Sequence, residues 1–284
     1  MTVGALMIAR NNTEIDYVKQ AVFNGYQIKR YLGIPVSLIT DNVDYLHDRF
    51  TEHPFDQIIE IQNTKDYGYK KYNDGTYSRR NLEFKNTTRA RAYELSPYDE
   101  TLLLDTDYII ANDLLKNCFN QLHDFLIYKD GIELSNWRDI SEFRTISSKG
   151  IDFYWATVVF FRKTPENKVF FSLLHHISEN YDHYRTIFQI TSPLFRNDYV
   201  FSIAIHIMNG YTNGDFAKPL PGKLFYTTDR DLLLRVNLDD FLFLIEKEKS
   251  YGNYMPLRMK GSSVHVMNKF SINRTIYVPQ MRDT

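Results

Sequence analysis

Two aspartates, Asp105 and Asp107, are the residues whose type and spacing could most readily do chemistry. They directly follow the apolar run of residues 102–104. In an extended chain alternate side chains point the same way, so both carboxylates should face one point while Thr106 faces away. Adjacent carboxylates repel unless a cation or proton lies between them, and hard divalent cations take oxygen ligands and can also bind phosphate. The pair therefore indicates a metal site; the alternative is that one aspartate caps the next element while the other is solvated.

A strand–helix–strand unit at the N-terminus should place more polar residues beside the aspartates. Residues 3–9 are predicted to form a buried strand, a helix follows and ends at Gly33, and residues 34–40 form a second strand. Such a unit favours parallel strands, and ligands of parallel sheets gather at the carboxyl ends of the strands. No GxGxxG sequence or Walker lysine loop follows the first strand, so no nicotinamide or flavin cofactor is expected. The residues expected near this edge are Ala9, Arg10, Asn11 and Asp41.

Composition limits the possible classes of protein. The chain has 284 residues, 43% of them hydrophobic and 24% charged, which is ordinary for a globular protein with a sizeable core. A formal net charge of -1 argues against a globally basic nucleic-acid binder. The single cysteine, Cys118, cannot form an internal disulfide and fits a reducing compartment. With no signal-peptide pattern and no stretch of membrane-spanning length, we expect a soluble, cytoplasmic protein.

Residues 65–91 form a basic and aromatic tract. The dipeptide Asp74-Gly75 predicts a turn, and the lack of an apolar period up to about Arg80 predicts a mobile loop. A helix should begin near residue 87. Such a tract can attract phosphates and stack on rings, or it can be a solvated loop. Its cations are Lys65, Lys70, Lys71, Arg79, Arg80, Lys85, Arg89 and Arg91, and its tyrosines are Tyr67, Tyr69, Tyr72 and Tyr77.

The second half of the chain offers fewer chemical signals. Residues 112–125 and 200–208 are predicted to be helices, residues 152–161 a strand, and residues 135–150 a polar, irregular stretch that contains Trp137 and Arg138. An acidic, leucine-rich segment around 239–248 is predicted to be another helix. Asp198, just before the apolar helical run, either caps that helix or belongs to a site.

The string from Arg89 to Ile110, RARAYELSPYDETLLLDTDYII, resembles a segment of metal-dependent GT-A glycosyltransferases, in particular the retaining group that includes glycogenin and bacterial lipopolysaccharide glycosyltransferases. In that group a basic residue on a helix, a turn and an apolar strand lead into Asp-x-Asp. The resemblance implies that Arg89 binds sugar or phosphate, with Arg91 as the competing choice. It also implies an α/β, Rossmann-like fold with a mixed, mainly parallel central sheet flanked by helices and a C-terminal extension.

The same resemblance extends to three later positions. His265 matches a histidine that completes the metal site, and Lys269 matches a lysine that pairs with the leaving diphosphate, although Asn268 stands where the family has glycine. Asp198 matches an aspartate near the reacting sugar, and Tyr199 replaces the glutamine that usually follows it. On the acceptor side the family has Asn-Ala-Gly. Here Trp155, Ala156 and Thr157 stand in those positions.

The resemblance thus implies a hexosyl- or pentosyltransferase that uses Mn²⁺ or Mg²⁺ and a nucleotide sugar, a UDP-sugar first. It would glycosylate a hydroxyl group of a saccharide or a protein with retention. The metal ligands would be Asp105, Asp107 and His265, with Thr106 contacting the donor. One domain would contain a donor half, about residues 1–110, and an acceptor half, about residues 111–284. The basic tract suggests hydroxymethylated phage-type DNA as an alternative acceptor, for an enzyme that is phage-encoded and acts in host cytoplasm. Further alternatives are a non-catalytic nucleotide-sugar-binding module and a phosphotransferase.

Overall fold

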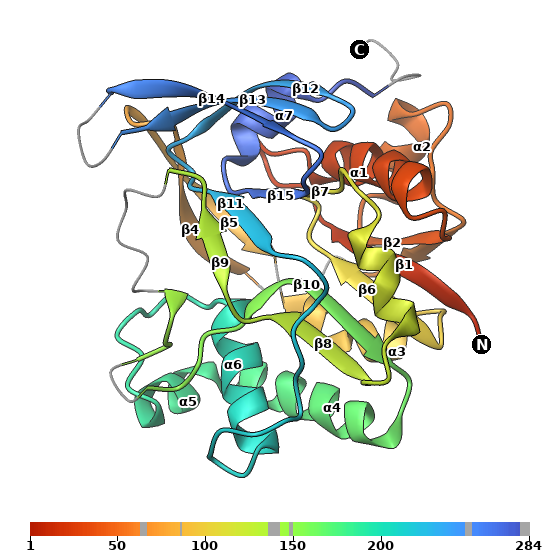
Figure 1. The fold of residues 1–284 in the computed structure, drawn as a ribbon, viewed down its shortest axis with the longest axis vertical. Coiled ribbons are helices and arrows are strands. Elements are labelled where there is room, and N and C mark those ends of the chain that lie inside the picture. The colour runs from red at the N-terminus through yellow and green to blue at the C-terminus, as the bar shows by residue number, and fades with distance from the viewer. Residues whose placement is uncertain (63–66, 86, 136–142, 148–149, 248–251, 279–284) are drawn as a thin grey trace.

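A six-stranded mixed sheet forms the centre of the computed structural model, which describes residues 1–62, 67–85, 87–135, 143–147, 150–247 and 252–278 (Figure 1). β1, β2, β3 and β6 run parallel, and β10 is antiparallel to both of its neighbours. The predicted α/β class with a mainly parallel sheet is confirmed. In spatial order the strands are β3 (Gln57–Glu60), β2 (Val36–Thr40), β1 (Val3–Ala9), β6 (Glu100–Leu104), β10 (Trp155–Arg162) and β8 (Phe125–Tyr128).

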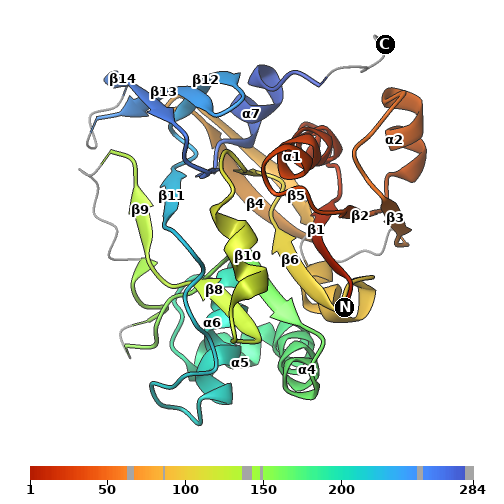
Figure 2. The same ribbon diagram turned by 45° about the vertical axis from the view of Figure 1, so that its right-hand side comes forward.

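Helices cover the sheet, and its central strands are buried on both faces. α1 (Tyr17–Tyr31) packs against β1 and β2, while α4 (Pro165–Glu179) and α6 (Asn197–Met208) pack together beside β10 (Figure 2). Every residue of β2 and β6 is buried, as expected for strands that read as continuous apolar runs. The remaining helices are α2 (Val43–Arg49), α3 (Ala92–Leu95), α5 (Tyr181–Ile187) and α7 (Lys269–Thr275).

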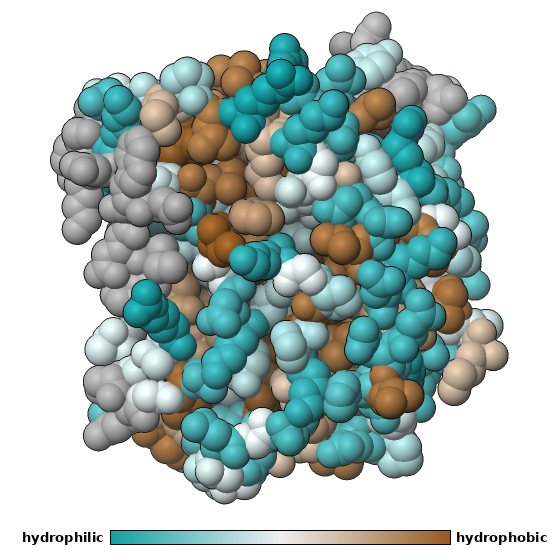
Figure 3. Space-filling view, viewed as in Figure 1, coloured by the Kyte–Doolittle hydropathy of each residue, from teal (hydrophilic) through white to brown (hydrophobic). Residues whose placement is uncertain are grey.

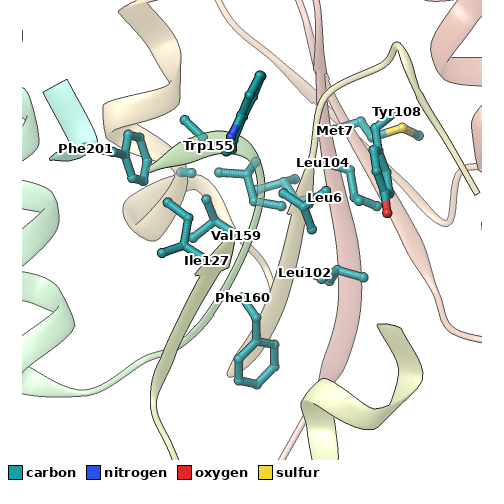
Figure 4. Close-up of a cluster of buried hydrophobic side chains, with 14 of the residues drawn as sticks. Leu6, Met7, Leu102, Leu104, Tyr108, Ile127, Trp155, Val159, Phe160 and Phe201 are labelled. Carbon is teal, nitrogen blue, oxygen red and sulfur yellow. The ribbon is translucent and has the colours of Figure 1, made fainter. Parts of the chain in front are cut away.

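Side chains from several of these strands meet in one apolar core. Figure 4 shows Leu6 and Met7 of β1, Leu102 and Leu104 of β6, and Val159 of β10 within one cluster. All five are fully buried. The face drawn in Figure 3 mixes hydrophilic and hydrophobic residues. Among the described residues, no helix is both long and apolar enough to cross a membrane.

A second, four-stranded sheet brings the C-terminal part of the chain to the end of β6. Its spatial order is β7 (Tyr108–Ile109), β15 (Val264–Val266), β11 (Leu224–Thr227) and β9 (Gly131–Glu133). β15 pairs antiparallel with β7, which places His265 opposite Tyr108. Because β7 begins directly after Asp107, this pairing determines which residues from the C-terminal part of the chain lie near the two aspartates.

The helix predicted around residues 239–248 is wrong, because these residues form strand β13 (Asp240–Glu246) between β12 (Leu232–Asn237) and β14 (Tyr254–Lys260). Burial alternates along β13, with Phe241, Phe243 and Ile245 fully buried. This is the period of two that belongs to a strand. Residue 248 lies outside the described part of the chain.

The mobile loop predicted within the basic tract is also wrong. Its described residues form an antiparallel hairpin of β4 (Tyr67–Asp74) and β5 (Ser78–Lys85), and the predicted turn at Asp74-Gly75 is confirmed, with Gly75 at φ +71°. Arg274 donates to both carboxylate oxygens of Asp74, at 2.6 and 2.7 Å. Since α7 supplies this contact from 200 residues away, no local sequence pattern could reveal how the hairpin is anchored. Lys65 and Asp66 lie outside the described residues.

Two predicted helices are shorter and tighter than expected. A 3₁₀ helix (Thr87–Arg91) leads into α3, and another 3₁₀ helix (Leu114–Asn120) stands where the helix over 112–125 was predicted. Trp137 and Arg138, in the stretch predicted to be irregular, lie outside the described residues.

Replacing Gly4 with alanine is expected to lower the free energy of unfolding by about 1–3 kcal/mol. A Cβ at Gly4, in β1, would overlap the ring of buried Tyr98, whose hydroxyl lies 2.7 Å from Ser37 Oγ on β2. Chemical denaturation measures the loss. Gly68→Ala on β4 is the matched control, because its Cβ would meet no atom within 4 Å. Equal stability of the two variants would contradict this packing.

Candidate active site

Asp105 and Asp107 lie in a tight turn between β6 and β7. The Asp105 amide donates to Thr157 O on β10 at 2.9 Å, and the Tyr108 amide donates back to Asp105 O at 3.2 Å. Thr106 Oγ1 donates instead to Gln20 Oε1 of α1 at 3.2 Å. The two carboxylates therefore point to one side and Thr106 to another, as predicted, although a turn rather than an extended strand produces this arrangement.

His265 joins the two aspartates through the pairing of β15 with β7. Its Nε2 lies 3.2 Å from Asp107 Oδ2, and its Nδ1 lies 3.4 Å from Thr157 Oγ1. One ligand atom from each of Asp105, Asp107 and His265 lies within 4.8 Å of the others. Two carboxylates and an imidazole suit a borderline divalent ion such as Mn²⁺. The residues present thus fit the predicted metal.

Each of the two carboxylates also contacts a cationic side chain. Arg89 Nη1 donates to Asp105 Oδ1 at 2.6 Å, and its Nη2 donates to the carbonyl oxygens of Ala156 and Thr157. Lys269, the first residue of α7, donates from Nζ to Asp107 Oδ2. Arg91 is half exposed and pairs with Glu94 at 3.6 Å. Of the two arginines considered from the sequence, Arg89 is therefore the one at the aspartates.

Burial and charge act differently on the two carboxyl groups. Burial raises the pKa of Asp105, and the neighbouring charge of Asp107 adds to this effect while Arg89 opposes it. Burial also disfavours the charged form of Asp107, but Lys269 and His265 outweigh it and hold the pKa of Asp107 below its usual range. The pKa values of the two carboxyl groups are therefore shifted in opposite directions, and Asp107 is the more acidic of the two.

Of the four residues predicted to lie near this edge of the sheet, Ala9, Arg10, Asn11 and Asp41, only one lines the pocket. Arg10 lines the pocket, and its Nε donates to Asp41 Oδ2 at 3.0 Å, so Asp41 lies buried behind it. The pocket lining does not include Ala9, Asn11 or Asp41. Asn11 Oδ1 accepts from the Val18 amide at 2.9 Å. Asn11 therefore holds the start of α1 rather than facing the pocket.

Asp198 lines the pocket from the first turn of α6. Its Oδ1 accepts from the Ala156 amide at 2.9 Å, and its Oδ2 accepts from Arg196 Nη2 at 3.0 Å. Arg196 is the N-cap residue of α6, and no side-chain capping bond forms there. Of the two interpretations of Asp198, the geometry agrees with the pocket position and not with the helix cap.

Several pocket residues were not identified individually from the sequence. The hairpin contributes Lys70, which lies inside the tract predicted to attract phosphates, but the composition of the tract could not show which cation turns inward. Asp229 accepts from Asn73 Nδ2 at 2.9 Å, and no motif marked it. The other residues of this kind are Ile8, Tyr17, Tyr72, Phe84, Lys85, Phe195, Arg196, Asn197 and Met267. The pocket lining also includes four residues that the sequence analysis named, Thr106, Trp155, Ala156 and Thr157.

Lys70→Met is expected to stabilise the protein at pH 7 by about 2 kcal/mol. Burial, followed by the charges of Lys269 and Arg196, lowers the pKa of Lys70 to about 8 despite the attraction of Asp198 and Asp229. A lysine whose folded-state pKa lies below its unfolded value of about 10.4 destabilises the fold while it is protonated in both states. This cost is present below pH 8 and fades between pH 8 and about 10.4.

Thermal unfolding at pH 7 and pH 10 measures this difference. The midpoint of Lys70→Met should exceed that of the wild type at pH 7, and the gap should shrink at pH 10. Lys71→Met is the control, because Lys71 is exposed on the other face of β4. A gap that stays constant across this pH range would show that Lys70 is not destabilised by its surroundings.

No protein-family model matches the chain, and no curated protein matches it in sequence. Among solved structures, the chain is similar to the glycosyltransferase GlyE of Streptococcus pneumoniae TIGR4 at 13% identity, covering 78% of this chain and 45% of that one with a TM-score of 0.44. It is similar to galactosyltransferase LgtC, in complex with donor and acceptor sugar analogues, at 10% identity, 70% of each chain and a TM-score of 0.45.

A third similar structure is the bifunctional IspDF of Campylobacter jejuni, at 12% identity, covering 78% of this chain and 50% of that one with a TM-score of 0.39. The chain therefore spans less than half the length of GlyE and half that of IspDF. Similarity at this level does not by itself indicate a shared activity.

Proposed function

We propose that this protein is a metal-dependent glycosyltransferase of the GT-A type, which transfers a sugar from a nucleotide sugar, first a UDP-sugar, to a hydroxyl group. The observation that carries the proposal is the convergence of Asp105, Asp107 and His265 in one pocket at the carboxyl end of β6. Ligands of parallel α/β sheets bind at this edge. The resemblance of the segment from Arg89 to Ile110 to the GT-A family supports the same assignment.

The main barrier to glycosyl transfer from such a donor is the negative charge that develops on the leaving diphosphate. A divalent ion held by Asp105, Asp107 and His265 would supply positive charge at that position. Arg89 keeps Asp105 in place through its bond to Oδ1, while its bonds to the carbonyls of Ala156 and Thr157 fix the guanidinium. Lys269 adds a cation beside Asp107, where it can also stabilise a leaving phosphate.

Asp198 is proposed to support the reaction with retention. Its bonds to the Ala156 amide and to Arg196 fix the carboxylate at the pocket wall beside β10. In a retaining, front-face transfer the departing phosphate accepts the proton of the attacking hydroxyl, and a fixed carboxylate stabilises positive charge on the sugar ring. Asp198 provides such a carboxylate.

The experiment that tests the proposal is Mn²⁺-dependent release of UDP from a panel of hexose and pentose nucleotide sugars. Release that stops on chelation and resumes with Mn²⁺ is the expected result. A non-catalytic binding module would bind a nucleotide sugar without releasing UDP. A phosphotransferase would move a radiolabelled phosphate, rather than a radiolabelled sugar, into the product.

A DNA acceptor with hydroxymethylated bases is the second candidate, because the outer side of the β4–β5 hairpin is basic. Arg79 is exposed there, and Tyr69 is 66% exposed. Arg80, which lies opposite Tyr72 on the other face of the hairpin, is also exposed and pairs with Glu14 at 3.5 Å. Exposed cations supply sequence-independent affinity for phosphates. If DNA is the acceptor, Arg79→Gln with Arg80→Gln should weaken DNA binding while UDP release is retained. Unchanged DNA affinity would exclude this surface as a DNA contact.

A further inference from the structure

Lys70 differs from the other cations that line the pocket. In the part of the chain that the structure describes, no carboxylate lies within 4.0 Å of its Nζ. Its ammonium group instead lies over the rings of Tyr72 and Phe84, at 5.5 and 5.2 Å from their centroids. The other pocket cations each have an acidic partner: Arg10 and Lys85 contact Asp41, Arg89 contacts Asp105, Arg196 contacts Asp198, and Lys269 contacts Asp107.

The strand that carries Lys70 is held in place from both sides. At the hairpin tip, Thr76 Oγ1 donates to Glu246 Oε1 at 2.6 Å, and Arg274 binds Asp74 with two hydrogen bonds. Nearer the pocket, the Tyr72 hydroxyl lies 3.2 Å from that of Tyr17 on α1. Because these contacts fix β4 at several points, Lys70 is presented to the pocket without a costly ordering step on binding.

The charges around Lys70 favour the binding of an anionic ligand in the pocket. Lys269 and Arg196 are close enough to disfavour its charged form. An anion placed among these three cations relieves their mutual repulsion and supplies a hydrogen-bond acceptor, which Lys70 lacks among the residues that the structure describes. A lysine ammonium is a compact point charge that suits phosphate oxygens.

We infer that Lys70 binds the diphosphate of the donor, so that the β4–β5 hairpin is a phosphate-binding element of the pocket. This inference rests on the proposed function, which supplies a diphosphate as the anion. A carboxylate on an acidic acceptor sugar is also an anion, as the donor diphosphate is. The measurement below distinguishes the two, because its probes contain only the donor's phosphate groups.

Isothermal titration calorimetry with Mn²⁺ present, using UDP and inorganic pyrophosphate as probes, tests the inference. Lys70→Met should weaken binding of both probes on the order of 10- to 100-fold, the usual contribution of a charge-assisted hydrogen bond. Lys71→Met removes the same charge from the exposed face of the same strand and should leave both affinities within about twofold of wild type. Lys70→Arg should retain part of the affinity.

Equal affinity of Lys70→Met and wild type for UDP and pyrophosphate would overturn the inference. Such a result, obtained while the wild type releases UDP from a nucleotide sugar, leaves the proposed function standing. Conversely, binding of pyrophosphate that depends on Lys70, without turnover of any nucleotide sugar, supports the phosphate-binding role and contradicts the proposed function.

Discussion

Asp107→Asn is expected to reduce Mn²⁺-dependent release of UDP by at least about 10²- to 10³-fold. Lys269 and His265 hold the pKa of Asp107 below its usual range, so an amide in its place removes a carboxylate ligand of the proposed metal site. The same change also leaves buried Lys269 without its acidic partner. Steady-state kinetics over a range of Mn²⁺ concentrations measures the effect, and Asp105→Asn should behave similarly.

Asp113→Asn is the matched control for this loss. It makes the same carboxylate-to-amide change six positions further along the chain, at an exposed residue that does not line the pocket. Its kinetics should equal those of the wild type. If Asp105→Asn and Asp107→Asn retain full activity, neither aspartate takes part in the reaction and the proposed metal site is wrong.

Arg89→Met is expected to lower the free energy of unfolding by about 3 kcal/mol. Only 3% of Arg89 is exposed, and its guanidinium bonds to Asp105 and to two carbonyl oxygens of β10. Methionine fills much of the volume but leaves these acceptors without their donor. For a chain of this length the midpoint of thermal unfolding should fall by about 6–12 °C. Differential scanning calorimetry measures the shift.

Arg91→Met provides the comparison, since Arg91 belongs to the same 3₁₀ helix but is half exposed and, within the described part of the chain, forms an ion pair only with the exposed Glu94. Exposed ion pairs of this kind contribute little, so the control should stay within about 0.5 kcal/mol of wild type. Equal stability of the Arg89 and Arg91 variants would mean that the buried arginine network does not support the fold.

The sequence was most informative where burial is nearly complete. β1 coincides with the predicted strand over residues 3–9, β2 lies within the predicted strand over residues 34–40, and β6 ends with the predicted apolar run of residues 102–104. Continuous apolar segments of this length have few other stable conformations in an α/β protein. β13 was missed because residues 239–248 contain acidic and leucine residues that suit a helix, whereas pairing with β12 and β14 imposes the strand.

In the site, too, residues held together by local contacts could be predicted from the sequence, and residues brought together by distant contacts could not. Asp105 and Asp107 could be identified from their spacing alone, because both belong to one turn and their carboxylates are close for that reason. His265 lies 158 residues from Asp107 and was suggested only by a family resemblance. Lys70 belongs to a tract that was recognised as basic, but the anchoring of its hairpin depends on Arg274 and Glu246, which no local pattern connects to it.

Titration with Mn²⁺, followed by the electron paramagnetic resonance signal of the free ion, tests the metal site most directly. In the presence of UDP we expect one Mn²⁺ to bind per chain of the wild type, and Asp107→Asn to lose this binding while Asp113→Asn retains it. No Mn²⁺ binding by the wild type, with or without UDP, or equal binding by Asp107→Asn, would contradict a metal site formed by Asp105, Asp107 and His265.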